Sequence, residues 1–457
     1  MYLQAVFERF VQKSPLTLMA RAALENALAP ADLNQLFGAH AELQYEKTLL
    51  FSSVVDLMGM VVCKVQPAVS AAYRAVEDTL PVTLKATYEK INGVEANVTA
   101  ALVRHTATRL GPVIEAMGGQ HAPLLPGYRV KIIDGNHLAS TERRLAALHQ
   151  CKAGPLPGHA LVILDPALML ATDMIPCEDG HAQERSLFSH VLAQVEPGDL
   201  WIGDRNFCTV GLFRGILEKK SAFAIRHHAS FPIASAGTLH RRGRCKTGEV
   251  DEQRITFLDE DGDKVEIRRI VVRLDEPTRD GTTELAILTN VPAKRASAAK
   301  IADLYSERWT LEGVFQTLTQ TLNGEIPSLA YPKAALFAFG VALVSYNIAA
   351  TIRAALRAKF GEETIEPNVS NYYIANEVRV TMGGMDVALD DEVWVPFQSM
   401  SAPLLAEALL NYAGHVRLSR LMRTSRGPKK PVPPRTRYTT ETHVSTARLL
   451  ARGGHRL

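Results

Sequence analysis

The chain has 457 residues, of which 47% are apolar and 22% are charged, a composition that fits a soluble globular protein of one to three domains. Five scattered cysteines without a C-x-x-C pair argue against a zinc site or a disulfide framework and suit a reducing cytoplasm, and the N-terminus lacks the uninterrupted apolar core of a signal peptide. The net charge of +3 is uneven: residues 415–457 hold 11 basic residues and one acid, so the rest holds 40 bases and 47 acids, a net charge of −7.

Apolar residues spaced three or four apart predict helices through residues 1–120, and a cluster of proline and glycine predicts a boundary near 121–127. The pattern then changes to mixed strands followed by helix–strand alternation, which indicates an α/β layer fold. The predicted strands are 128–134, 159–166, 168–175, 198–204 and 222–228, and the predicted helices are 181–195 and 209–220.

Residues 229–293 are rich in strand-like sequence without clear helices, and "DEDGD" at 259–263 predicts a hairpin turn. Helical periodicity returns at residue 296, and a further helix fills 333–360. Its stretch 334–352 is nearly long enough to cross a membrane, but its polar and small residues favour a buried core helix. A shorter mixed region leads to a basic, proline-rich tail, for which a solvated tail and contact with nucleic-acid phosphates both stay open.

Three carboxylates are candidates for one site. Asp134 and Asp204 each end a predicted strand, so one sheet could point both into one pocket, although aspartate is also common where strands turn. The stretch "YSERWTLE" places Tyr305, Arg308 and Glu312 at i, i+3 and i+7, on one face of a helix. A solvated Arg–Glu pair is the alternative. The neighbouring apolar residues favour a mostly buried helix, in which an acid needs a partner or a metal; they are Trp309, Leu311, Val314, Phe315 and Leu318.

Tyr-x2-Arg-x3-Glu on a helix, preceded by "IIDGNHLASTERRL" and "GDLWIGDRNF", resembles the DDE transposases of bacterial insertion sequences, specifically the fourth insertion-sequence family. The resemblance covers about residues 40–360. It implies an α/β fold with a ribonuclease-H-like core and an inserted β-rich subdomain, preceded and followed by helical regions. The expected domains are a helical region with candidate DNA-end recognition (1–122), the first part of the catalytic core (123–228), the inserted subdomain (229–293), the second part of the core with the Glu-bearing helix (294–360), and a C-terminal region with the basic tail (361–457).

The resemblance implies that Asp134, Asp204 and Glu312 are the catalytic residues and hold two Mg²⁺ ions, with Mn²⁺ able to replace Mg²⁺. The expected reaction is an endonucleolytic cut at the ends of the element, made by water, followed by attack of the freed 3′-OH on target DNA. Tyr305 and Arg308 are expected to hold a phosphate near the terminal nucleotide.

Arg226 and Arg205 are further expected DNA contacts, with a salt-bridge role left open for Arg226. The implied partner is DNA, both element ends and target, bound by a homodimer that brings two ends together without any membrane. The implied location is the cytoplasm, in association with the nucleoid.

Two features depart from the family. Thr319 stands where the family usually has a lysine, and residues 282–292 lack the aromatic on which some relatives stack a flipped base, so a hairpin intermediate is in doubt. His137, His227 and His228 are interpreted as local or structural residues and not as metal ligands. Two other functions stay open: a catalytically silent DNA-binding protein derived from a transposase, and a metal-dependent nuclease of the same fold that cleaves without joining.

The basic tail is expected to contribute to DNA binding. Arg417, Arg420 and Arg423 recur every three residues and could line one helical face. Further basic residues follow on the proline-rich stretch: Lys429, Lys430, Arg435 and Arg437.

Overall fold

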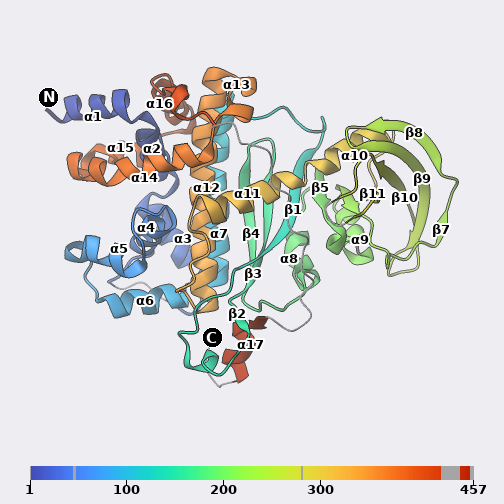
Figure 1. Ribbon diagram of the computed structural model, residues 1–457, viewed down its shortest axis with the longest axis horizontal. Helices are drawn as coiled ribbons and strands as arrows, with labels where there is room; N and C mark the ends of the chain where they lie inside the picture. Colours follow the sequence, from blue (N-terminus) through green and yellow to red (C-terminus); the bar gives the residue numbers. More distant parts are fainter. Residues whose placement is uncertain (1, 45–47, 279–280, 424–442, 453–457) are drawn as a thin grey trace.

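The computed structural model describes residues 2–44, 48–278, 281–423 and 443–452. Figure 1 shows a helical part on one side, a central sheet, and a curved group of strands on the other side. The strands are β1 (Arg129–His137), β2 (Gly154–Leu156), β3 (His159–Asp165), β4 (Leu170–Cys177), β5 (Asp199–Gly203), β6 (Ala222–Arg226), β7 (Ser235–Ala236), β8 (His240–Cys245), β9 (Gly248–Leu258), β10 (Lys264–Leu274), β11 (Glu284–Thr289) and β12 (His443–Ser445).

The helices confirm the helical expectation for the first 120 residues and for the region after residue 296. The α-helices are α1 (Tyr2–Lys13), α2 (Pro15–Ala27), α3 (Pro30–His40), α4 (Phe51–Val62), α5 (Val69–Val76), α6 (Leu84–Gly93), α7 (Ala96–Ala116), α8 (Phe188–Ala193), α9 (Val210–Glu218), α10 (Ala298–Ser306), α11 (Trp309–Gln320), α12 (Pro332–Phe360), α13 (Glu362–Asn368), α14 (Asn371–Ala388), α15 (Val395–Gln398), α16 (Ala402–Ala413) and α17 (Thr446–Arg452). Short 3₁₀ helices are η1 (Glu77–Thr79), η2 (Ala146–Leu148), η3 (Glu184–Leu187), η4 (Arg205–Phe207), η5 (Asp391–Val393) and η6 (Leu418–Arg420).

The core half of the sheet has the strand order β4-β3-β1-β5-β6, which confirms an α/β fold. Strand β1 pairs antiparallel with β3 and parallel with β5, and β5 pairs parallel with β6. All five residues of β5 are buried because helices cover both faces of the sheet. Successive residues therefore enter different cores: Leu200 packs on the side of α7 and α12, and Trp201 packs with residues of α8 and α9.

The strands of the segment 229–293 extend the core sheet and do not form a separate one. Strand β11 pairs antiparallel with β6, and β10, β9 and β7 follow in order, with β8 paired to β9. Strands β9 and β10 form a long hairpin whose turn lies at the predicted position, where Asp259 accepts hydrogen bonds from the backbone N–H groups of Asp261 and Asp263. Helix α10 packs against β8 and β9 and connects this part to the rest of the sheet (Figure 1).

The predicted helix over 181–195 is wrong in its length. Only η3 and α8 form, over residues 184–193. The preceding residues make a turn instead, because the side chain and the carbonyl of Asp179 accept hydrogen bonds from the N–H groups of His181 and Ala182.

Helix α12 is the central helix of the fold and confirms the predicted core helix. By length and composition it is the one helix among the described residues that could cross a membrane, yet 89% of its most apolar window is buried within the protein. It packs against α7, α4 and α16 (Figure 1).

The predicted helical face of Arg417, Arg420 and Arg423 is wrong. These residues lie in a turn with the short η6, and Arg423 is held by its Nε donating to the carbonyl of Val369 (3.1 Å). The predicted basic residues Lys429, Lys430, Arg435 and Arg437 lie outside the described residues. Beyond them, β12 pairs parallel with β2 and is followed by α17.

One side chain satisfies the free edge of the sheet at Ala171 in β4. Asn347 of α12 is fully buried, its Nδ2 donates to the Ala171 carbonyl (2.9 Å), and its Oδ1 accepts from the Ala171 N–H (2.8 Å). Asparagine can serve both groups at once, so it takes the place of a neighbouring strand.

We expect Asn347→Leu to lower the free energy of unfolding by about 2–4 kcal/mol, because it leaves two buried backbone groups without partners. Thr351→Val is the matched control, since Thr351 is equally buried one turn along the same helix and donates only to a carbonyl of that helix. Its expected cost is about 1 kcal/mol or less. Chemical unfolding followed by circular dichroism measures both, and equal losses would contradict the role of Asn347.

Candidate active site

Asp134 lies inside β1 and not at its end, which corrects the predicted strand boundary. The parallel ladder with β5 ends at the pair Ile132 and Ile202, whereas the antiparallel ladder with β3 continues to His137. Asp134 is therefore the second residue beyond the point where β5 stops supporting β1. Its Oδ1 accepts from the N–H of Gly135 (2.9 Å), and its side chain is mostly buried.

Asp204 directly follows β5, as predicted. It caps η4, where its Oδ1 accepts from the N–H of Asn206 (2.7 Å). Gly203 makes this tight turn possible, since a Cβ at that position would lie only 3.1–3.3 Å from the side chain of Phe207. The buried Phe207 ring thus anchors the turn, and Asp204 follows the C-terminal end of β5, next to strand β1.

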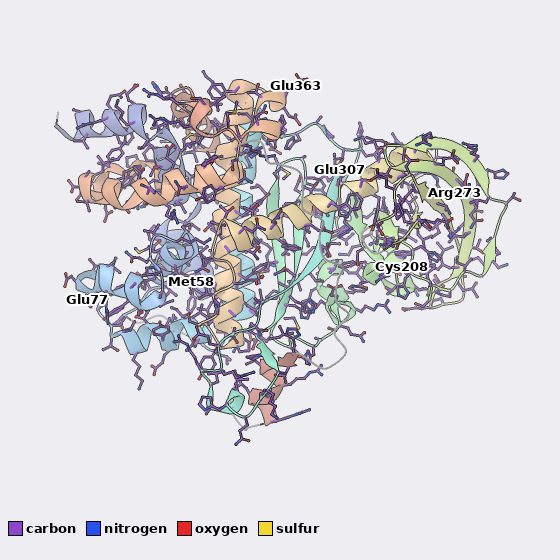
Figure 2. The ribbon with its side chains drawn as sticks, in the orientation of Figure 1. Met58, Glu77, Cys208, Arg273, Glu307 and Glu363 are labelled. Atoms are coloured by element: carbon purple, nitrogen blue, oxygen red, sulfur yellow. The ribbon has the colours of Figure 1, made fainter. Side chains whose placement is uncertain are left out.

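The motif of Tyr305, Arg308 and Glu312 spans two helices, so the predicted single helix is wrong. Helix α10 ends at Ser306 and α11 begins at Trp309; Glu307, labelled in Figure 2, marks the junction. The N–H of Arg308 donates to the carbonyl of Tyr305 (3.1 Å), a tightened turn of 3₁₀ type. Helix α11 then contacts β1, which carries the motif to Asp134.

Arg308 joins two of the three predicted carboxylates. Its Nη1 donates to Asp134 Oδ2 (2.7 Å) and its Nη2 donates to Glu312 Oε1 (2.9 Å). Because both oxygens contact nitrogens of one planar guanidinium, they lie within about 8 Å of each other. The structure therefore brings together Asp134 and Glu312 from segments that are far apart in the sequence.

The exposure of Glu312 differs from the expectation. Its side chain is 55% exposed, and Trp309 is 47% exposed, so α11 buries only one face, through Leu311, Val314 and Leu318. The Arg308–Glu312 pair at i,i+4, which was the alternative interpretation of the motif, does form. Glu312 faces solvent at the site, where a substrate can reach it.

The electrostatics place Asp204 near the same group. The pKa of Asp134 is raised to about 6, chiefly by burial; the negative charges of Asp204 and Glu312 add to the rise, whereas Arg308 and the N–H of Gly135 oppose it. A cation that approaches Asp134 would lower this pKa and favour the ionised carboxylate. Arg308 thus joins Asp134 and Glu312, and the charge of Asp204 acts on Asp134.

The predicted DNA contacts differ in exposure: Tyr305 is buried, whereas Arg205 is exposed. Tyr305 is only 5% exposed, and burial raises its pKa to about 12, while the positive charges of Arg308 and Arg226 lower it. Arg226, the last residue of β6, therefore lies near the Tyr305 hydroxyl. Arg205, at the start of η4, is exposed beside Asp204.

Glu184 and Asn206 belong to the same region and were missed in the sequence. Glu184 Oε2 accepts from Asn206 Nδ2 (3.1 Å), and Glu184 Oε1 lies where a Cβ on residue 135 would be, so Gly135 makes room for it. Burial raises the pKa of Glu184, and the charges of Asp204 and Asp134 add to this effect. Glu184 is in a 3₁₀ turn without hydrophobic periodicity, so only the glycine after Asp134 hinted at a neighbour there.

The remaining candidate residues take local positions. His137 stacks on His159 with ring centroids 5.0 Å apart, the backbone N–H of His227 donates to Ala286, and Nδ1 of His228 lies 2.7 Å from Ser230 Oγ. Thr319 is exposed on α11, and its hydroxyl donates to the carbonyl of Phe315. Within the part of the chain that the structure describes, no group of three His, Cys, Asp or Glu side chains is already arranged around a metal position.

Comparison with known proteins finds one family for this region. Residues 126–348, which run from just before β1 into α12 and include Asp134, Asp204 and Glu312, match the family model described as the transposase DDE domain. A search of curated proteins finds no match. The match covers just under half of the chain and supports a DDE transposase; this family implies DNA binding, and its domains generally use divalent metal ions.

Proposed function

We propose that this protein is a DNA transposase of the fourth insertion-sequence family, which cuts the ends of its element and joins the 3′-OH to target DNA by two-metal phosphoryl transfer. The observation that carries the proposal is the single guanidinium of Arg308 between Asp134 and Glu312, with Asp204 coupled to Asp134, inside the transposase-domain match. The order β4-β3-β1-β5-β6, with β3 antiparallel to its neighbours, supports a ribonuclease-H-like core.

The donor set fits hard divalent cations. Asp134, Asp204 and Glu312 provide carboxylate oxygens, which Mg²⁺ and Mn²⁺ prefer, and a cationic group already lies between two of them. These three residues would hold the metal, which supplies charge neutralisation at the phosphate and activation of the attacking oxygen. Glu184, next to Asp134 and Asp204, adds negative charge that favours cation binding.

The protein's own side chains would position the DNA phosphate. Arg308 is fixed at its base by the tightened turn between α10 and α11 and carries a fork of donors suited to a phosphate. With a divalent cation held by Asp134 and Glu312, the guanidinium of Arg308 would be free to bind a DNA phosphate, with the Tyr305 hydroxyl and Arg226 beside it. Arg205, exposed directly after Asp204, would add a further positive charge.

An element has two ends, so we propose that two copies act together as a homodimer, in the cytoplasm and on the nucleoid. Helices α1–α7 precede the catalytic core and are the candidate for recognition of the ends. A single-copy complex competent for joining would contradict the dimer.

The central test uses a plasmid that carries the DNA flanking the coding region on both sides, incubated with the protein and Mg²⁺. Wild type should give end cleavage and joined products, whereas Asp204→Asn and Glu312→Gln should lower both by roughly 10³-fold or more, because each removes a metal-holding carboxylate. Glu307→Gln, at the junction between α10 and α11, is the matched control with the same loss of charge.

The products separate the competing functions. Cleavage without joining would indicate a nuclease of the same fold, and DNA binding without either step would indicate a catalytically silent protein. Loss of activity in Glu307→Gln equal to that in Glu312→Gln would show that charge alone, and not the site, is responsible.

Metal binding has its own readout in thermal unfolding. We expect Mn²⁺ or Mg²⁺ to raise the midpoint of the wild type, by about 2.7 kcal/mol of stability at a hundredfold excess over the dissociation constant. Asp134→Asn should abolish the shift. Arg308→Gln should bind Mn²⁺ on the order of tenfold more tightly, because it removes the cation that occupies the carboxylates. Weaker Mn²⁺ binding by Arg308→Gln would reject the exchange between Arg308 and metal.

The role of the tail is best tested at constant length, because truncation at residue 424 would also remove β12 and α17, which pack against the body. Changing Lys429, Lys430, Arg435 and Arg437 to glutamine should weaken binding to element-end DNA and reduce the salt dependence by about 0.9 in slope for each phosphate that the tail no longer neutralises. A variant with residues 424–442 in shuffled order keeps the charge and should keep the slope. Equal slopes in wild type and glutamine variant would reject the contribution of the tail.

A further inference from the structure

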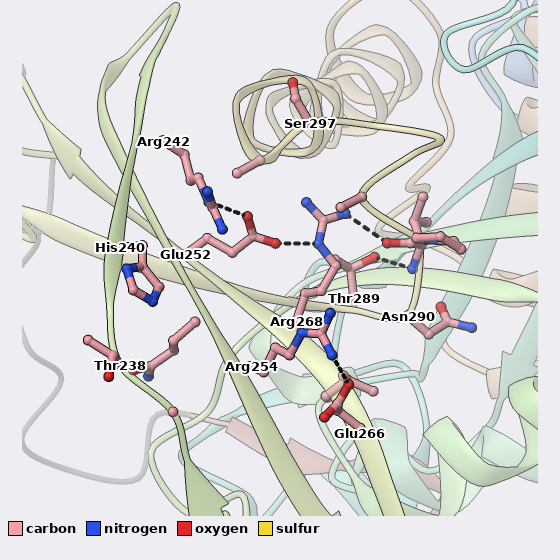
Figure 3. A pocket seen from close by; sticks show the side chains of 17 residues that line it. Thr238, His240, Arg242, Glu252, Arg254, Glu266, Arg268, Thr289, Asn290 and Ser297 are labelled. Carbon is pink, nitrogen blue, oxygen red and sulfur yellow. Dashed lines mark hydrogen bonds and ion pairs between the residues drawn. The ribbon is translucent and has the colours of Figure 1, made fainter.

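A polar pocket lies in the curved group of strands, away from the carboxylates. Its volume is about 800 Å³, and its wall is formed by β8, β9, β10, the end of β11 and the beginning of α10 (Figure 3). Neither the motif nor the carboxylate group lines it, so the proposed reaction does not account for it.

The pocket contains a buried arginine with one unused donor. Arg268 is only 8% exposed; its Nε donates to Glu252 (2.5 Å) and its Nη1 donates to the carbonyls of Val291 (2.7 Å) and Ala296 (3.0 Å). Nη2 has no hydrogen-bond partner among the described residues. A buried guanidinium N–H without an acceptor is costly, so an oxygen supplied from outside would be bound favourably there.

The surroundings of Arg268 carry an excess of positive charge. Arg242 donates to Glu252 (3.0 Å) and Arg254 donates to Glu266 (2.8 Å), so three arginines share two carboxylates, and His240 lies beside them. Figure 3 shows Arg242 and His240 to the left of the Arg268 guanidinium and Arg254 below it; its nitrogen without a partner points to the space between Arg242 and Ser297.

The beginning of α10 adds to this positive field. Ser297 caps the nine-residue helix through a hydrogen bond from the N–H of Lys300, and both Ser297 and Ala298 line the pocket. A helix N-terminus attracts anions, and the planar fork of arginine suits phosphate oxygens. The volume exceeds that of one phosphate and has room for the rest of a nucleotide.

We propose that this pocket binds a phosphate group of a nucleotide, with one phosphate oxygen accepting from Arg268 Nη2. The phosphate belongs either to a DNA strand or to a free nucleotide, and both present the same chemistry. A strand is within reach of the carboxylate site, because α10 runs from Ser297 to the Tyr305 turn over about 12 Å.

The test uses two double variants of the full-length protein. Arg242→Gln with Arg254→Gln removes two cations from the pocket wall and leaves the buried Arg268 in place. Arg241→Gln with Arg273→Gln makes the same charge change on the same group of strands at exposed positions that do not line the pocket. Unchanged circular dichroism and thermal unfolding establish that both variants are folded.

The probes are inorganic phosphate, a deoxynucleoside monophosphate, a single-stranded oligonucleotide and citrate, each titrated by calorimetry or fluorescence anisotropy. The pocket variant should bind the monophosphate, the oligonucleotide, or both at least tenfold more weakly than wild type, and the control variant should not. A loss confined to the oligonucleotide identifies a strand phosphate as the ligand, and a loss for the monophosphate identifies a free nucleotide.

Three outcomes would overturn the proposal. They are equal losses in the two double variants, binding of citrate as tight as binding of the phosphates, and no loss with any phosphate probe. Arg268→Lys adds a separate check, because it keeps the charge but removes the free fork nitrogen; its phosphate affinity should fall below that of wild type even if the strands stay folded.

Discussion

The acidic site depends on one ion-pair network, in which Arg308 holds Asp134 and Glu312. Carboxylates brought to one edge of a sheet repel each other, and the raised pKa of Asp134 reports that repulsion together with burial. The guanidinium offsets it from a position 174 residues away from Asp134 in the sequence. Without this counter-charge, Asp134 and Glu312 would repel each other when both are ionised.

The same network explains why the site needs the break between α10 and α11. The tightened turn at Arg308 ends the helix that carries Tyr305 and starts the helix that carries Glu312, so the arginine can face the carboxylates and the tyrosine at once. Glu312 stays half-exposed on the outer side of this turn. The arrangement keeps Arg308, Arg226 and the Tyr305 hydroxyl near carboxylates that can bind a cation. This combination suits a negatively charged substrate.

The sequence predicts this site in outline because its signals are local. Gly203-Asp204 after an apolar run marks the end of β5, and the spacing from Tyr305 to Glu312 is visible without any structure. The misplaced end of β1 has a non-local cause, since the pairing with β3 continues past Asp134 and no residue near Asp134 reveals it. The prediction that Glu312 is buried was wrong, because apolar residues on a helix show that one face is buried and leave the burial of the other faces undetermined.

Other features lie beyond the reach of sequence patterns. Glu184 accepts a hydrogen bond from Asn206, and the two residues come together through a turn. Arg268 donates to the carbonyls of Val291 and Ala296, which only the folded chain brings next to it. An unused donor is a property of three-dimensional surroundings, so an arginine in an alternating strand gives no sign of it.

The ladder between β6 and β11 has a mechanical consequence. Three residue pairs, from Ala224 with Thr289 to Arg226 with Ile287, join the curved strands to the central sheet in one continuous hydrogen-bonded sheet. Hinge motion between the two parts would break this ladder, so the ladder keeps the distance from the pocket to the carboxylates constant. Excising the curved strands would leave β6 with an unpaired edge open to pairing with other chains, and a protein shortened in this way should aggregate.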